Sequence, residues 1–167
     1  MHQESDRRGR RPYEAFGIPE FRTLLLGISF VHIGAAAQSL AIGWEMYQRT
    51  DQALALGLIG LTQAIPMLLF TLPAGYLAEV YSRRKVMIAG MAGTTLTSLA
   101  LAVFSIRAGS IAWMYALLFL DASFHRLANP AWSAILPLLV PENLFENAVK
   151  WRTTVFQLSA VIGPALG

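Results

Sequence analysis

Long apolar runs without a charged side chain alternate with short polar segments along the chain. Asp, Glu, Lys and Arg are absent from residues 23–44, 52–78 and 86–106. A helix needs about 20 apolar residues to cross a bilayer, because each residue rises ~1.5 Å through ~30 Å of hydrocarbon. Each of these runs is therefore predicted to form one membrane-spanning helix.

Two more apolar segments follow, and the first of them is interrupted by Asp121, His125 and Arg126. None of the segments alternates as barrel strands do, and a helix satisfies its own backbone in lipid. The sequence therefore predicts an all-α integral membrane protein, with a cytoplasmic tail over residues 1–20. Its five transmembrane helices are expected at residues 22–46, 53–79, 86–106, 110–136 and 148–167.

The amino-acid composition excludes several classes of function. Only 14% of the residues are charged, whereas soluble domains average about 25%. Cysteine is absent, and the three histidines, at positions 2, 32 and 125, share no metal-ligand spacing. No Gly-rich phosphate loop occurs and no group of side chains is typical of an active site. We expect neither an enzyme nor a cofactor or metal site.

The basic residues predict the orientation. If the N-terminus is cytoplasmic and the helices alternate, only Arg49 and Arg107 lie outside and Arg126 lies within the membrane. The other ten cations lie inside: Arg7, Arg8, Arg10, Arg11, Arg22, Arg83, Arg84, Lys85, Lys150 and Arg152. The positive-inside rule favours this arrangement. We expect a multi-pass protein of the inner (plasma) membrane whose cations face lipid headgroups, with no nucleic acid as partner.

Residues 75–86, with the sequence GYLAEVYSRRKV, place one carboxylate before three cations. Gly75 and Glu79 are four residues apart and share a helix face. A neighbouring helix can approach closely at Gly75. The Glu79 carboxylate can then cap that helix's N-terminus or pair with Arg83 or Arg84.

This stretch resembles the signature loop between helices two and three of the major facilitator superfamily. The matching residues are Gly75, Leu77, Ala78, Glu79, Arg83 and Arg84. Glu79 replaces the commoner Asp, and Ser82 replaces the second Gly. The resemblance implies a gating loop, whose acid and cations make contacts in the outward-open state that break in the inward-facing state.

Residues 161–167, with the sequence VIGPALG, resemble the Gly-Pro-x-x-Gly motif in the fifth helix of proton-coupled drug exporters. Gly163 and Gly167 would form a close-packing face, and Pro164 would permit a bend. Ordinary packing of small residues is the alternative. Residues 53–70 and 135–149 are similar to the branch that includes enterobactin exporters and macrolide-efflux proteins.

Ionisable side chains within a membrane are costly and usually face an interior cavity. Asp121 and His125 share a face of the fourth predicted helix, so we hypothesise that they carry a coupling proton. A structural clamp between helices is the alternative. The resemblance places the superfamily's helix-four arginine at Leu118, so Arg126 does not inherit its role.

Three polar residues in the first two helices are candidates for lining a substrate cavity: His32, Gln38 and Gln63. A single interhelical hydrogen bond is the alternative interpretation for each of them.

The resemblance implies a secondary active transporter of two six-helix halves. Residues 21–167 would be an incomplete N-terminal half, whose missing partner is the C-terminal half, and would not transport alone. The expected function is proton-coupled export of a small amphipathic molecule by alternating access. The alternatives are an importer or uniporter of the same superfamily, or a membrane scaffold or sensor that transports nothing.

Overall fold

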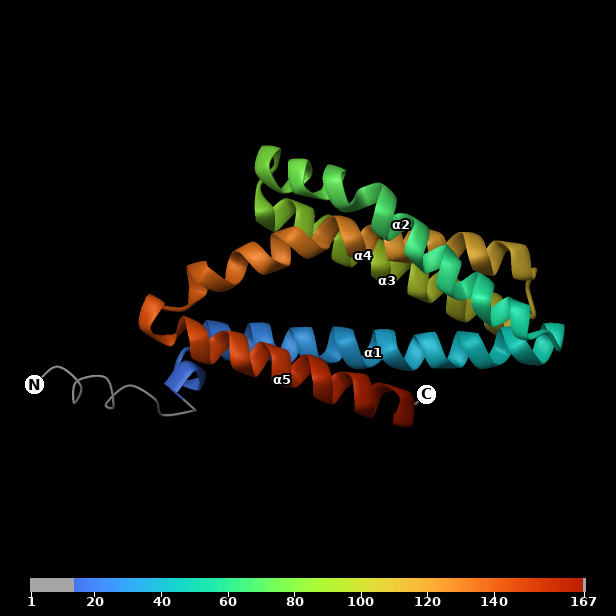
Figure 1. Ribbon diagram of the computed structural model, residues 1–167, viewed down its shortest axis with the longest axis horizontal. Helices are drawn as coiled ribbons and strands as arrows, with labels where there is room; N and C mark the ends of the chain where they lie inside the picture. The colour runs from blue at the N-terminus through green and yellow to red at the C-terminus, as the bar shows by residue number, and fades with distance from the viewer. Residues whose placement is uncertain (1–13, 167) are drawn as a thin grey trace, which may run out of the picture. The chain divides into compact units, whose positions relative to one another are not determined.

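The computed structural model describes residues 14–166, apart from the side chains of residues 78–79 and 131–134. A short 3-10 helix, η2 (Glu14–Gly17), precedes five α-helices (Figure 1). These are α1 (Pro19–Thr50), α2 (Ala53–Val80), α3 (Arg83–Ile106), α4 (Ile111–Leu139) and α5 (Glu142–Leu166). Residues 14–166 contain no strand. Each α-helix overlaps one of the five expected ranges.

Three helices of the described chain are long and apolar enough to cross a membrane, judged by length and composition. They are Pro19–Thr50, Ala53–Leu77 and Arg83–Ile106. α4 carries Asp121, His125 and Arg126 within its length. α5 begins six residues before its expected start, and the added residues include Glu142, Asn143, Glu146 and Asn147. Glu146 forms an exposed ion pair with Lys150. That α4 and α5 also cross the membrane remains a prediction.

The chain divides into two compact units. Unit 1 comprises Met1–Leu40 and Ile135–Gly167, and unit 2 comprises Ala41–Ala134. In unit 1, α5 runs beside the first part of α1 (Figure 1). The core of this unit is formed by residues from η2, α1 and the two ends of the α4–α5 connection: Ala15, Phe21, Leu25, Leu136, Val140 and Ala148.

The segment before α1 is packed rather than loose from Glu14 onward. The Phe16 ring meets the Trp151 ring edge-on, with centroids 4.7 Å apart, and lies 6.1 Å from the Phe21 ring. Such edge-to-face pairs add stability beyond the area that they bury. Pro19 occupies the first position of α1, where its missing N–H costs nothing. η2 is thus fastened to α5.

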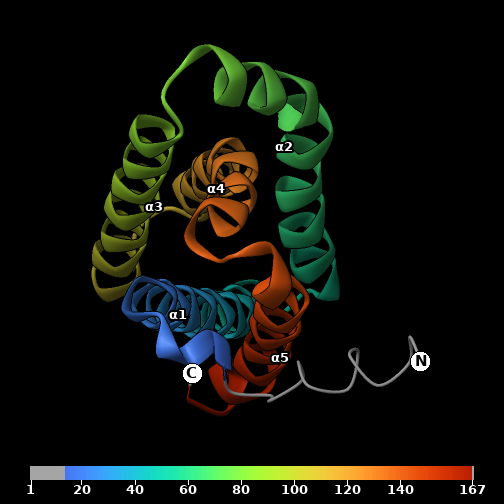
Figure 2. The same cartoon turned by 90° about the vertical axis from the view of Figure 1, so that its left-hand side faces the viewer.

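In unit 2, α4 lies between α2 and α3 (Figure 2). The buried residues of α3 recur at helical spacing along one face: Gly90, Gly93, Thr97 and Leu101. The core of the unit is formed by α1, α2, α3 and α4: Ile42, Met46, Ile59, Leu101, Met114 and Leu118.

α2 bends along its length (Figure 2), and it contains Pro66 and Pro73. Each proline lacks the N–H that would bond to the carbonyl four residues earlier, so the carbonyls of Thr62 and Leu69 lose that partner. Pro66 is fully buried. Kinks of this kind are tolerated in membrane helices when neighbours pack against them.

Candidate functional site

Thr97 on α3 and Asp121 on α4 form a polar contact inside unit 2. The Thr97 hydroxyl lies 2.6 Å from Asp121 Oδ1. Thr97 is only 6% exposed, and Asp121 is half-buried. A charged acceptor at this distance makes a strong hydrogen bond. The two helices are therefore joined at the position where the sequence predicted an intramembrane carboxylate.

His125 lies at the midpoint of α4, one turn beyond Asp121, and is also half-buried. It is close enough for its charge to act on Asp121, as Arg126 acts on His125. In the described part of the chain, no hydrogen bond or ion pair joins Asp121 to His125; the carboxylate is bonded to Thr97. The interhelical contact expected as the alternative is present, and the coupling role remains a prediction.

Two glycines bring α3 and α4 close enough for this contact. A Cβ placed on Gly90 would collide with the Ala128 methyl and lie 3.3 Å from the Phe124 carbonyl oxygen. A Cβ on Gly93 would collide with the Phe124 ring. These two glycines were not predicted to be packing positions. Their spacing of three residues, one turn before Thr97, is the signal that identifies them.

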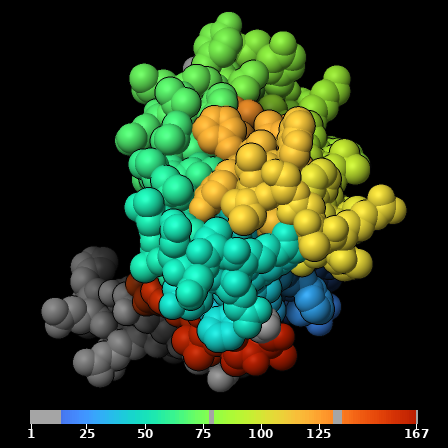
Figure 3. All heavy atoms as spheres, turned by 90° about the vertical axis from the view of Figure 1, so that its right-hand side faces the viewer, coloured from blue at the N-terminus to red at the C-terminus, as the bar shows by residue number. Residues whose placement is uncertain are grey.

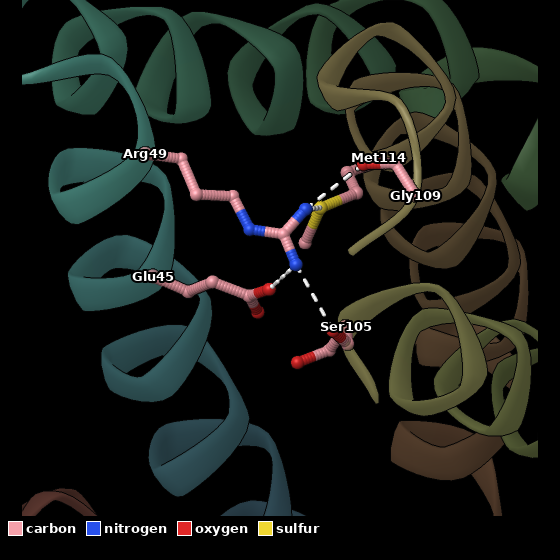
Figure 4. A network of polar contacts seen from close by, with 5 residues as sticks. All are labelled: Glu45, Arg49, Ser105, Gly109 and Met114. Atoms are coloured by element: carbon pink, nitrogen blue, oxygen red, sulfur yellow. Dashed lines mark hydrogen bonds and ion pairs between the residues drawn. The ribbon is translucent and has the colours of Figure 1, made fainter. Parts of the chain in front are cut away.

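A second polar network joins the end of α1 to the α3–α4 connection (Figure 4). Arg49 donates hydrogen bonds of 2.9 Å to the carbonyl oxygens of Ser105 and Gly109, and it also contacts the Met114 sulfur. Glu45, one turn earlier on α1, forms an ion pair with the same guanidinium. The sequence placed Arg49 outside the membrane but gave no sign of these partners.

This network lies beside two residues in left-handed backbone conformations. Asp51 has φ 51° and Ala108 has φ 48°. Asp tolerates this region, whereas Ala pays roughly 1–2 kcal/mol for it. The α1–α2 and α3–α4 connections lie against each other at this end of unit 2 (Figure 3). Arg49 stabilises the turn that contains the strained Ala108.

The predicted gating loop is a two-residue connection between α2 and α3. Gly75 and Leu77 lie in the last turns of α2, and Arg83 and Arg84 are exposed in the first turn of α3. The side chains of Ala78 and Glu79 lie outside the described residues. A Cβ on Gly75 would meet no described atom within 4 Å. Ser82 has φ −60°, so this position does not need the glycine that the superfamily signature has.

The fifth-helix residues lie against α1 in unit 1. A Cβ on Gly163 would collide with the Ala36 methyl and approach the Ile33 carbonyl oxygen to 2.8 Å. Gly163 is thus a point of close helix approach, while Pro164 is exposed and Gly167 lies outside the described residues. The exporter role of this motif remains a prediction.

The cavity candidates are all half-buried. His32 on α1 meets the Phe156 ring of α5 edge-on, with centroids 5.0 Å apart. Gln38 lies in unit 1 and Gln63 in unit 2. That they line a substrate cavity remains a prediction.

Comparison with known proteins identifies the family. The chain is similar to macrolide efflux protein A of Streptococcus pyogenes, with 24% identity over 148 residues, or 88% of this chain and 36% of that protein. It is 29% identical over 147 residues to an uncharacterized MFS-type transporter of Bacillus subtilis, covering 87% of this chain and 34% of that protein. The chain thus spans about a third of the length of these relatives.

No solved structure matches the chain significantly. The family model described as "transmembrane secretion effector" matches residues 11–167. This range includes all five α-helices and both polar networks. The chain therefore belongs to the transmembrane secretion effector family of major facilitator transporters, and its helices correspond to the N-terminal part of that fold.

Proposed function

We propose that the complete protein exports a small amphipathic molecule in exchange for protons, by alternating access. The observation that carries the proposal is the half-buried Asp121 carboxylate, held by Thr97 near the middle of α4. An intramembrane carboxylate is costly and is typical of proton pathways in transporters. The relative named as a macrolide efflux protein supports outward transport and suggests macrolides as the first substrates to test.

Asp121 binds and releases the coupling proton in this proposal, and His125 modulates the charge beside it. The protein lies in the plasma membrane with its N-terminus in the cytoplasm, because this orientation places ten of the 13 cations inside. The connection at Ser82 then lies at the cytoplasmic end, where Arg83 and Arg84 serve the gate. The C-terminal half of the complete protein supplies the other wall of the substrate cavity.

The proposal is tested by macrolide accumulation in a strain without other exporters, carrying the complete gene or its Asp121→Asn variant. We expect the unmodified protein to lower accumulation, and a protonophore to abolish this effect. Asp121→Asn still accepts the Thr97 hydrogen bond but no longer titrates, so at least a tenfold loss of gradient-driven efflux is expected. Thermal unfolding in detergent verifies that the variant folds. Unchanged gradient-driven efflux would remove Asp121 from the coupling mechanism.

A further inference from the structure

Thr97 has more hydrogen-bond acceptors around it than it has hydrogens to give. Its hydroxyl lies 2.6 Å from Asp121 Oδ1 and 3.0 Å from the carbonyl oxygens of both Gly93 and Thr94. A hydroxyl carries one hydrogen and two lone pairs, and its hydrogen rotates to suit the surroundings. At any moment only one of the three contacts uses the Thr97 hydrogen. The Thr97 hydrogen can therefore be donated in two ways, either to Asp121 on α4 or to a carbonyl oxygen of its own helix, that of Gly93 or Thr94.

The two arrangements match the two protonation states of Asp121. When Asp121 is ionised, Thr97 donates its hydrogen to Oδ1. When a proton binds at Oδ1, the new carboxylic O–H donates to Thr97 Oγ1, and the Thr97 hydrogen turns to the Gly93 carbonyl. Thr97 never gives up its own hydrogen, and the only proton gained or lost is that of Asp121. Thr97 Oγ1 and Asp121 Oδ1 remain hydrogen-bonded to each other in both states, which avoids the cost of an unpaired buried polar atom.

We propose that Thr97 is a positioning residue for proton exchange at Asp121: it holds the carboxyl group in one place and bonds to both its charged and its neutral form. The inference rests on the proposed function, in which Asp121 carries the coupling proton. It adds a residue on α3 whose hydroxyl helps to set the pH at which the exchange occurs, although it never becomes charged.

The charged surroundings of Asp121 are sparse, so its hydroxyl partner has a large influence. Asp, Glu, His, Lys and Arg are absent from α3 between Val86 and Ile106, and from α2 between Ala53 and Ala78, where Tyr76 is the titratable side chain. On α4 the charged or titratable neighbours are His125 and Arg126. On the unit 2 part of α1 they are Glu45 and Arg49, which pair with each other at the end of the helix. Among the described residues, Thr97 donates the hydrogen bond that the Asp121 carboxylate accepts.

The register of α3 against α4 fixes this partnership. Gly90 lies against Ala128 and Gly93 against Phe124, and one turn further Thr97 reaches Asp121. Leu101 and Leu118 share the core beyond it. Contacts therefore advance along α3 as they retreat along α4, as in an antiparallel pair. The side chains at positions 97 and 121 therefore stay in contact as long as α3 and α4 remain packed together.

The test compares Thr97→Val, which keeps the shape and removes the hydroxyl, with Thr97→Ser, which keeps the hydroxyl. Both are made in the full-length protein, and macrolide efflux is measured across external pH. We expect Thr97→Val to displace the pH of half-maximal efflux by about one unit, a tenfold change in proton concentration. Thr97→Ser should stay close to the unmodified profile. Thr95→Val is the matched control, because Thr95 is exposed and bonds to Met91 of its own helix.

Infrared difference spectroscopy of the purified protein gives a readout that a purely structural role would not change. The carboxylic C=O band that disappears in Asp121→Asn belongs to protonated Asp121. It should move to higher frequency in Thr97→Val, where the acid has lost its acceptor, and remain in place in Thr97→Ser. If Thr97→Val does not fold, Thr97→Ala removes the same hydroxyl with less bulk and is expected to show the same displacement.

The outcomes separate this inference from the proposed function. If Asp121→Asn abolishes gradient-driven efflux while Thr97→Val and Thr97→Ala keep the unmodified pH profile and band, Thr97 has no positioning role and the proposed function stands. If Asp121→Asn leaves gradient-driven efflux unchanged, the coupling role of Asp121 in the proposed function and the inference about Thr97 are both overturned. If the pH profile is displaced in Thr97→Val but stays in place in Thr97→Ser, the inference is supported.

Discussion

Arg49 Nη1 lies 2.9 Å from the carbonyl oxygen of Gly109, sixty residues further along the chain. A second bond of 2.9 Å from Nη2 to Ser105 makes the guanidinium a fork across the end of α3. The Ser105 carbonyl also accepts a hydrogen bond from the Ala108 N–H, and a cation beside the last carbonyls of a helix offsets their partial negative charge. The Arg49 side chain is only 21% exposed and is neutralised by Glu45. It closes this end of unit 2 without leaving a buried net charge.

Replacing Arg49 should therefore destabilise the protein. Arg49→Ala removes two charge-assisted bonds and leaves Glu45 unpaired, so we expect a loss of about 1.5–3 kcal/mol in unfolding free energy. Arg49→Lys keeps the charge but not the fork, and an intermediate loss is expected. Both are measured by thermal unfolding in detergent. Arg107→Ala removes an exposed arginine from the same end of α3 and should change stability by less than about 0.5 kcal/mol. Equal effects of Arg49→Ala and Arg107→Ala would show that the Arg49 hydrogen bonds do not stabilise the protein.

Gly90 should not tolerate a methyl group. In an exposed helix Gly→Ala gains up to about 1 kcal/mol, but here the added Cβ collides with the Ala128 methyl. Overpacking costs about 1–3 kcal/mol, so a net loss is expected for Gly90→Ala. Adding Ala128→Gly returns the space and should recover part of the loss. Unfolding of the two single variants and the double variant measures this coupling.

Gly57→Ala is the control for that cycle. A Cβ at Gly57 on α2 meets no described atom within 4 Å, so only the helix preference acts and stability should rise. Additive effects of Gly90→Ala and Ala128→Gly would show that α3 and α4 do not approach each other closely there.

The helices were predictable from the sequence because membrane thickness dictates the length of an apolar run. Residues 86–106 were expected as a helix, and α3 runs from Arg83 to Ile106. The added turn contains cations, which hydropathy cannot assign to a helix or a loop. For the same reason α5 begins earlier than expected, since its first two turns include Glu142, Asn143, Glu146 and Asn147.

The packing of the helices was less predictable. In lipid both faces of a helix are apolar, so hydropathy does not reveal which face packs against a neighbour. Small residues carry that information, and Gly163 was identified in this way, whereas Gly90 and Gly93 were missed. The Arg49 network was missed for another reason: its acceptors are backbone carbonyls, which every residue has.

Asp121 was predictable in part. Its importance was recognised because a carboxylate within an apolar run is costly and therefore indicates a functional or structural role. Its neighbour on the same helix, His125, was proposed as the partner because helical spacing is readable from sequence. The bond to Thr97 depends on the register between two helices, which only the folded structure supplies.

The contact between Phe16 and Trp151 should couple η2 to α5 energetically. Phe16→Ala and Trp151→Ala are expected to interact by about 0.5–1.5 kcal/mol in a double-mutant cycle, because their rings meet edge-on. The measurement is thermal unfolding of the purified protein. Phe16→Ala combined with Leu166→Ala is the control, since Leu166 is exposed at the other end of α5 and the two effects should add. Additivity of the Phe16 and Trp151 variants would mean that η2 is not fastened to α5.

The orientation in the membrane can be tested with single thiols, because these 167 residues contain no cysteine. Ser82 and Gln52 are both exposed and flank opposite ends of α2. The three cations from Arg83 to Lys85 favour the proposed orientation, in which the Ser82 end lies in the cytoplasm. In intact cells an impermeant maleimide should therefore label Gln52→Cys and spare Ser82→Cys, which becomes reactive only after permeabilisation. The reverse pattern would invert the topology and move the predicted gating loop to the outer surface.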